Sequence, residues 1–120
     1  AALIGQLPDT FAVYSGDDPT ALSLMRHGAK GNISVTANVA AEAMAALCRY
    51  ALVGDFDAAQ RIDDQLQGLN KALFLEPNPI PVKWAMAEQG MMGGTLRLPL
   101  VTLSDEYHKP VRAALQQANL

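Results

Sequence analysis

The sequence predicts an α/β protein, because two strand–helix units follow one another directly and helices occupy the rest of the chain. In each unit a short β-branched run is bounded by turn residues, and a helix with an apolar repeat follows. Two consecutive units imply parallel strands with right-handed crossovers, which place both helices on one side of the strand pair. Barrels and doubly wound sheets share this arrangement, so the pattern by itself leaves both open.

The first unit covers residues 10–28. Residues 10–14 (TFAVY) are the predicted strand, and turn residues follow it. Asp18 before Pro19 is typical of a helix start, with the aspartate as N-cap and the proline in the first turn. We expect this helix to end near Gly28.

The second unit covers residues 31–54. Residues 32–36 (NISVT) are the predicted strand, which comes directly after Gly31. Asn38 is suited to cap a long helix that contains Met44 and Leu47 and closes at Gly54.

Residues 55–120 contain no further clear strand pattern. A helical repeat of apolar residues covers residues 56–75, and the prolines at 77–81 favour an extended connector before a helix over residues 82–89. A glycine-containing loop follows, and Ser104 or Asp105 can cap the last helix. We expect Pro110 to restart that helix after a tight first turn, because a proline inside a helix removes a hydrogen bond.

Composition excludes several function classes. The formal net charge is −3, and no run of Lys or Arg marks a surface for nucleic acid. No apolar stretch is long enough for a membrane helix, and no secretory signal is visible. Cys48 is the only cysteine, which excludes an internal disulfide and favours the cytoplasm.

The two predicted strands cannot form a finished sheet. A barrel closes with about eight strands. Both strands are apolar on both faces, as buried parallel strands are, so Phe11, Val13, Ile33 and Val35 need partners that this sequence does not supply. We expect the missing strands to precede residue 1, where Ala instead of Met suggests processing or truncation.

Three motifs resemble the dihydrodipicolinate synthase family of pyruvate-dependent class I aldolases. Residues 14–18 read YSGDD, residues 28–39 read GAKGNISVTANV, and residues 76–83 read EPNPIPVK. Their order and spacing are similar to the last third to half of the family's chain, over nearly all of this sequence. Sialic acid lyases share the barrel, but they usually differ in the strand motifs and lack so close a match to residues 78–83.

The resemblance implies the C-terminal part of a (β/α)8 barrel. Residues 10–15 and 32–36 would be strands seven and eight, and residues 38–53 the eighth helix. The chain would then divide into residues 1–54, the last two βα units, and residues 55–120, a helical C-terminal extension.

The resemblance also implies an activity that this chain lacks by itself. The family condenses pyruvate with aspartate semialdehyde in lysine and diaminopimelate synthesis, through a Schiff base on a lysine of the sixth strand. That lysine, the proton-relay tyrosines and the lysine-binding regulatory site would all lie before Ala1. We therefore expect no catalytic residue in this chain, no activity from it alone, no cofactor, and a homotetrameric parent.

Two positions match family residues that line the pyruvate pocket: Gly16 at the end of the seventh strand and Ile33 in the eighth. A residue without a Cβ admits close approach of the substrate, and an apolar side chain excludes water from an imine.

Other polar residues have simpler roles. Asp17 and Asp18 resemble an acid/base pair, but a helix cap and helix dipole explain both. Lys30 and Lys83 are candidate imine lysines only if the resemblance is set aside. His27, His108 and Cys48 have no metal-ligand spacing, so we expect no metal site.

Two further interpretations remain at this stage. Residues 90–94 (GMMGG) are glycine-rich, but a helix stop explains them better than a phosphate-binding loop. The chain as a whole is either a portion of a carbon–carbon lyase or a non-catalytic remnant that keeps only scaffold and assembly surfaces. In the family, the helix after the seventh strand lies toward a subunit contact, near Arg26 and His27.

Overall fold

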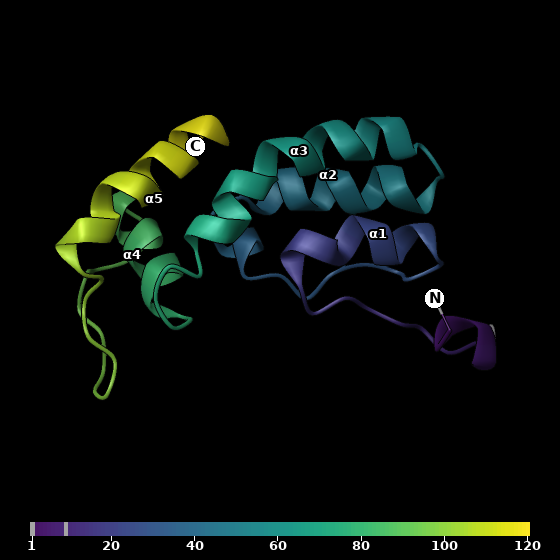
Figure 1. The fold of residues 1–120 in the computed structure, drawn as a ribbon, viewed down its shortest axis with the longest axis horizontal. Helices are drawn as coiled ribbons and strands as arrows, with labels where there is room; N and C mark the ends of the chain where they lie inside the picture. The colour runs from purple at the N-terminus through teal and green to yellow at the C-terminus, as the bar shows by residue number, and fades with distance from the viewer. Residues whose placement is uncertain (1, 9) are drawn as a thin grey trace.

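The regular elements in residues 2–8 and 10–120, which the computed structural model describes, are helices (Figure 1). Three are short 3-10 helices: η1 (Ile4–Gln6), η2 (Asp18–Thr20) and η3 (Thr36–Asn38). Five are α-helices: α1 (Ala21–Arg26), α2 (Ala41–Leu52), α3 (Phe56–Ala72), α4 (Ile80–Glu88) and α5 (Asp105–Gln117).

The two predicted strands are parallel, but they are shorter than predicted. The Lys30 and Ser15 amides donate to the Val13 and Gly31 carbonyls at 2.7 and 2.9 Å. The Ile33 amide donates to the Ser15 carbonyl at 2.8 Å, and Ser15 forms an isolated parallel bridge with Asn32. Full strands over residues 10–15 and 32–36 were therefore a wrong prediction for this chain. Extended segments need hydrogen-bonding neighbours, and the outer edges of this pair have none in the described part of the chain.

Helices α1, α2 and α3 lie side by side at one end of the molecule (Figure 1). Helix α2 starts at Ala41, and not at the predicted cap Asn38, because residues 36–38 form η3 first. The interface buries a small apolar cluster from α1, α2 and α3 and from the loop after α1. Its members are Leu22, Met25, Ala29, Leu47, Ala51 and Ala59.

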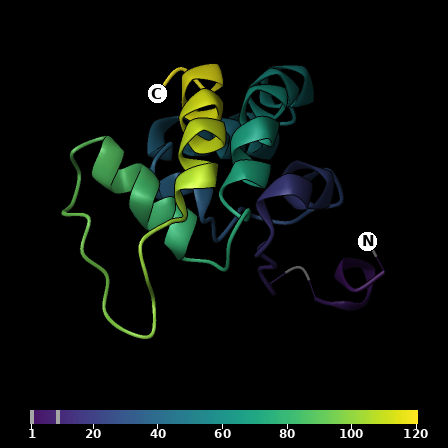
Figure 2. The same cartoon turned by 60° about the vertical axis from the view of Figure 1, so that its left-hand side comes forward.

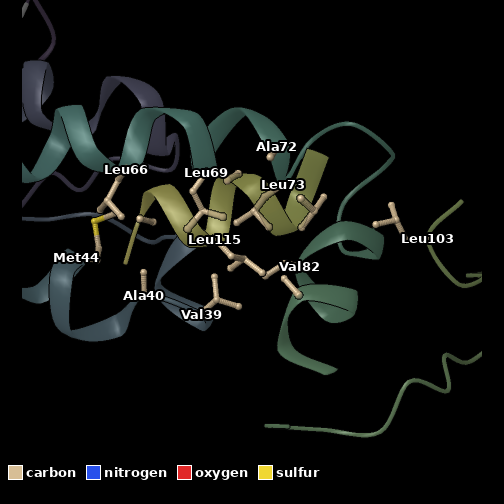
Figure 3. Packing of buried hydrophobic residues seen from close by; sticks show 14 of the residues in the cluster. Val39, Ala40, Met44, Leu66, Leu69, Ala72, Leu73, Val82, Leu103 and Leu115 are labelled. Atoms are coloured by element: carbon tan, nitrogen blue, oxygen red, sulfur yellow. The ribbon is translucent and has the colours of Figure 1, made fainter. Parts of the chain in front are cut away.

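A larger core joins the second βα unit to the C-terminal helices (Figure 3). Met44 of α2 and Leu66 of α3 belong to it, together with Val82 of α4 and Leu115 of α5. Leu66, Leu69 and Leu73 are fully buried, which matches the helical repeat predicted for residues 56–75. This core contains residues from both sides of the predicted boundary at residue 54.

The connector between α3 and α4 is bent and not extended as predicted. Helix α4 begins at Ile80 and includes Pro81 in its first turn, where its missing N–H leaves no hydrogen bond unmade. The loop between α4 and α5 extends away from the helices (Figure 2).

Helix α5 continues through Pro110 instead of restarting there. Val111, Ala114 and Leu115 are buried on one face of the helix. The burial of this face in the core offsets the one backbone hydrogen bond that the proline removes.

Candidate functional site

The structure brings the two predicted pocket residues together. Gly16 and Ile33 are the next residues along from the bridged pair Ser15 and Asn32, so they lie side by side at the ends of the two parallel segments. Ile33 is 72 % exposed, and a Cβ added to Gly16 would meet nothing within 4 Å. Both residues therefore face open space on this chain.

Asp18, two residues after Gly16, is buried and 4 % exposed. Its Oδ1 accepts a hydrogen bond from Asn32 Nδ2 at 2.6 Å, and its Oδ2 accepts from the backbone amides of Val35 and Thr36 at 2.9 Å each. We call these four residues the Asp18 clamp. It joins η2, which directly precedes α1, to the second parallel segment and the start of η3.

The expectation that Asp17 and Asp18 cap their own helix was wrong. Asp17 is the N-cap of η2, but its side chain makes no capping bond there and accepts from the Thr20 hydroxyl at 2.5 Å. Asp18 instead supplies the acceptor for the start of η3. The charged oxygen goes to these amides because they are buried and otherwise unpaired, and because hydrogen bonds to an ionised acceptor are strong.

A second polar link anchors the same segment from the other side. The Thr36 hydroxyl donates to Asn70 Oδ1 of α3 at 2.7 Å, and both residues are buried. Sequence reasoning missed this pair. The available signal was Asn70, a polar residue next to Leu69 in the apolar repeat of the helix.

A hollow of about 260 Å³ adjoins Ile33. It lies between the second parallel segment and the start of α4, and it contains one lysine, Lys83. The lining residues are Ile33, Ser34, Val35, Asn38, Asn78, Pro79, Val82, Lys83 and Met86. The other lysine considered from the sequence, Lys30, lines a separate hollow with Phe11 and Val13 near the N-terminus.

The two histidines and the cysteine are not grouped at one site. His27 Nδ1 lies 2.8 Å from the Ser23 carbonyl, while the His108 ring stacks on Trp84 with centroids 4.5 Å apart. Burial raises the pKa of the Cys48 thiol, and a hydrogen bond with the Asn32 backbone lowers it by less, so the thiol stays protonated. Within residues 2–8 and 10–120, no three His, Cys, Asp or Glu side chains are grouped to hold a metal ion.

The glycine-rich loop and the helix lengths give two further results. Gly90 has φ +72° directly after α4, which is the geometry of a helix stop. Among the described residues, every helix is too short or too polar to cross a bilayer.

The family model described as the dihydrodipicolinate synthetase family matches residues 2–118. The chain belongs to this family. The 4-hydroxy-tetrahydrodipicolinate synthase of Stutzerimonas stutzeri is 53 % identical over 118 residues, which are 98 % of this chain and 40 % of that protein. The synthase of Ralstonia nicotianae is 55 % identical over 120 residues, which are 100 % of this chain and 41 % of that protein.

Solved dihydrodipicolinate synthases have the same fold over this region. The chloride-inhibited enzyme from Acinetobacter baumannii, crystallised with pyruvate, superposes with a TM-score of 0.94 at 48 % identity, covering 98 % of this chain and 40 % of that one. A variant described as monomeric superposes with a TM-score of 0.93 at 38 % identity, covering 99 % of this chain and 40 % of that one.

The chain spans about two fifths of the length of the relatives it matches. It corresponds to the C-terminal part of their (β/α)8 barrel, as the resemblance implied. This explains the short parallel pair, because in the barrel other strands border both segments.

Proposed function

We propose that this chain is the C-terminal portion of a 4-hydroxy-tetrahydrodipicolinate synthase. The whole protein would condense pyruvate with aspartate semialdehyde through a lysine Schiff base, in the synthesis of diaminopimelate and lysine. The observation that carries the proposal is identity of more than half the residues, over the whole chain, to a protein of that name. The pyruvate in the related crystal structure supports this substrate.

Gly16 and Ile33 are the proposed pyruvate-pocket residues of this portion. They lie at the carboxyl ends of the two parallel segments, and barrel enzymes bind substrate at that face. Gly16 leaves room for the substrate carboxylate or imine to approach the backbone. Ile33 adds an apolar wall, which protects an imine from hydrolysis once the other strands close the pocket.

The proposed partner of this chain is the preceding part of the same barrel. Phe11 and Tyr14 are 59 % and 55 % exposed on the first parallel segment, and Ile33 is exposed on the second. Apolar side chains of this size are buried where strands continue a sheet. We place the imine lysine and the proton-relay residues in that preceding part, so the chain alone would be inactive.

The parent would be cytoplasmic and would form a homotetramer, with Arg26 and His27 at the end of α1 near a subunit contact. Arg26 lies over the Phe56 ring, 4.7 Å from its centroid, so its side chain is already ordered at that surface. Because one relative is described as monomeric, the oligomeric state needs a direct test, which is sedimentation of the whole protein.

Borohydride trapping tests the proposed function. The full-length protein is reduced in the presence of pyruvate, which converts an imine into a stable secondary amine, and the adduct is located by peptide mass mapping. We expect one lysine to be modified, outside residues 1–120. Modification of Lys30 or Lys83 would contradict this placement.

Trapping together with a turnover assay on the full-length protein separates the alternatives. A trapped imine that turns over with aspartate semialdehyde supports the synthase. Turnover with an N-acylated amino sugar instead would indicate a sialic acid lyase, and a whole protein that traps no pyruvate would indicate a scaffold without catalytic function.

A further inference from the structure

The Asp18 clamp holds the backbone on both sides of Ile33. Asn32 is bound through its side chain, and Val35 is bound through its amide, so Ile33 and Ser34 lie between two anchored residues. The Ile33 amide itself donates to Ser15. We propose that Asp18 is a positioning residue of the pyruvate pocket, which sets where Ile33 lies relative to Gly16. This inference rests on the proposed function.

Ile33 needs such support because its own side chain supplies none. It is 72 % exposed here, so its location is decided by the backbone and not by packing around the side chain. The Gly16 side of the pair is held in a similar way. The Ser15 hydroxyl donates to the Asp17 carbonyl and accepts from the Asp17 amide, both at 3.1 Å, which fixes the turn that contains Gly16.

The surroundings of Asp18 suit it to this positioning role. It is buried, and within the described part of the chain it forms no ion pair, so N–H donors alone balance its charge. Removing the carboxylate leaves two backbone amides without an acceptor and leaves Asn32 Nδ2 with only the Met44 sulfur, at 3.7 Å. Unpaired buried donors are costly, and the segment is expected to move to reach water. Ile33 would move with it.

Asn32 offers a way to test hydrogen bonding apart from charge. Its Oδ1 is buried and has no hydrogen-bond partner in the described residues, while its Nδ2 faces Asp18. If residue 18 becomes asparagine, the Asn32 amide can turn over, so that Oδ1 accepts from the new amide. The one side-chain oxygen that remains at residue 18 takes the place of Oδ2 and still accepts from Val35 and Thr36. Asp18→Asn therefore keeps the clamp, whereas Asp18→Ala destroys it.

Asn32→Asp, unlike Asp18→Asn, disrupts the clamp. It places a second carboxylate at the position of an amide that lies 2.6 Å from Asp18 Oδ1, and like charges at that separation repel. The exchange variant Asp18→Asn with Asn32→Asp restores one carboxylate and one amide in contact. Rescue by the exchange would show that the pair, and not either residue alone, positions the segment.

The experiment measures KM for pyruvate, kcat and Tm on the full-length protein. We expect Asp18→Ala and Asn32→Asp each to raise KM for pyruvate by about tenfold or more, because small displacements of pocket groups have large effects. The exchange variant should return KM to within about threefold of wild type, which corresponds to less than about 1 kcal/mol. Leu115→Ala, in the core at α5, is the control that lowers Tm without removing a hydrogen bond of the clamp.

Specific outcomes overturn the proposal. If Asp18→Ala lowers Tm and leaves KM unchanged, as Leu115→Ala should, Asp18 has only a structural role. If Asp18→Ala does not fold, Asn32→Asp and the exchange variant decide, and lack of rescue contradicts the clamp. A wild-type protein that traps no pyruvate with borohydride overturns the proposed function and the pocket with it, whereas normal trapping with an unchanged KM in the variants overturns the clamp alone.

Discussion

Asp63 on α3 is a buried carboxylate whose charged form destabilises the folded state. Its carboxylate is buried and accepts from Gln67 Nε2 at 3.0 Å. Burial raises the pKa of Asp63, the Gln67 hydrogen bond opposes this, Asp64 adds to it and Arg26 opposes it. The folded state therefore holds the Asp63 proton more tightly than the unfolded state, whose ordinary value is 3.8.

The raised pKa of Asp63 makes the stability of the folded state depend on pH. As pH rises above about 3.8 and through the raised pKa, the folded state loses stability at Asp63, and the loss is complete once the pH exceeds the raised pKa. Asp63→Asn removes the loss, so we expect the variant to be more stable than wild type at pH 7. The advantage should shrink as pH falls. Thermal unfolding of the full-length protein between pH 4 and 7 measures it.

Asp64→Asn is the matched control. Asp64 is the exposed neighbour on the same helix, and it accepts from Gln60 Nε2. Substitutions at exposed positions usually have small effects on stability. If both variants have the same pH dependence, the burial of Asp63 is not the cause.

At the scale of elements, α3 begins with a side-chain cap. Asp55 is its N-cap, and Oδ1 of Asp55 accepts from the Ala58 amide at 3.0 Å. This bond satisfies one of the free amides of the first turn. Helix α3 contributes to both apolar clusters, so its start affects the whole molecule.

We expect Asp55→Ala to lower the free energy of unfolding by about 0.5–2 kcal/mol, because it removes this acceptor. Asp55→Ser keeps an oxygen that can accept the same bond and should recover most of the loss. Chemical denaturation of the full-length protein compares the two. Equal losses in both variants would show that the cap is not what stabilises the start of α3.

At the scale of the whole molecule, the chain presents apolar surface where a barrel continues. Phe11, Tyr14 and Ile33 are all more than half exposed. Apolar and aromatic side chains of this size are usually mostly buried. On the proposed function, the preceding part of the barrel covers them.

Reconstitution of the barrel from two chains tests this proposed interface. We expect residues 1–120 alone to bind a hydrophobic dye and to form no imine with pyruvate. Co-expression with the preceding part of the barrel should abolish dye binding and restore borohydride trapping. The chain alone behaving as a dye-free monomer would contradict the proposed interface.

Much of the architecture could be predicted from local sequence. The apolar repeat of residues 56–75 predicted α3 to within a few residues, because a helix with one buried face needs regularly spaced apolar residues. The two strand-like runs predicted a parallel pair, which the structure has in shorter form. Helix ends were less accurate, since Asn38 lies in η3 instead of capping α2.

Local sequence patterns were therefore enough to predict the main helices, the parallel pair and the family. What Asp18 binds depends on the packed fold, because its acceptor oxygens meet donors 14 to 18 residues further along the chain. The same holds for the link between Thr36 and Asn70, which are 34 residues apart, and for Pro110, where core packing prevails over local helix propensity. Local patterns report on neighbours within a turn or a strand, whereas buried polar groups take whichever partner the packed fold brings to them.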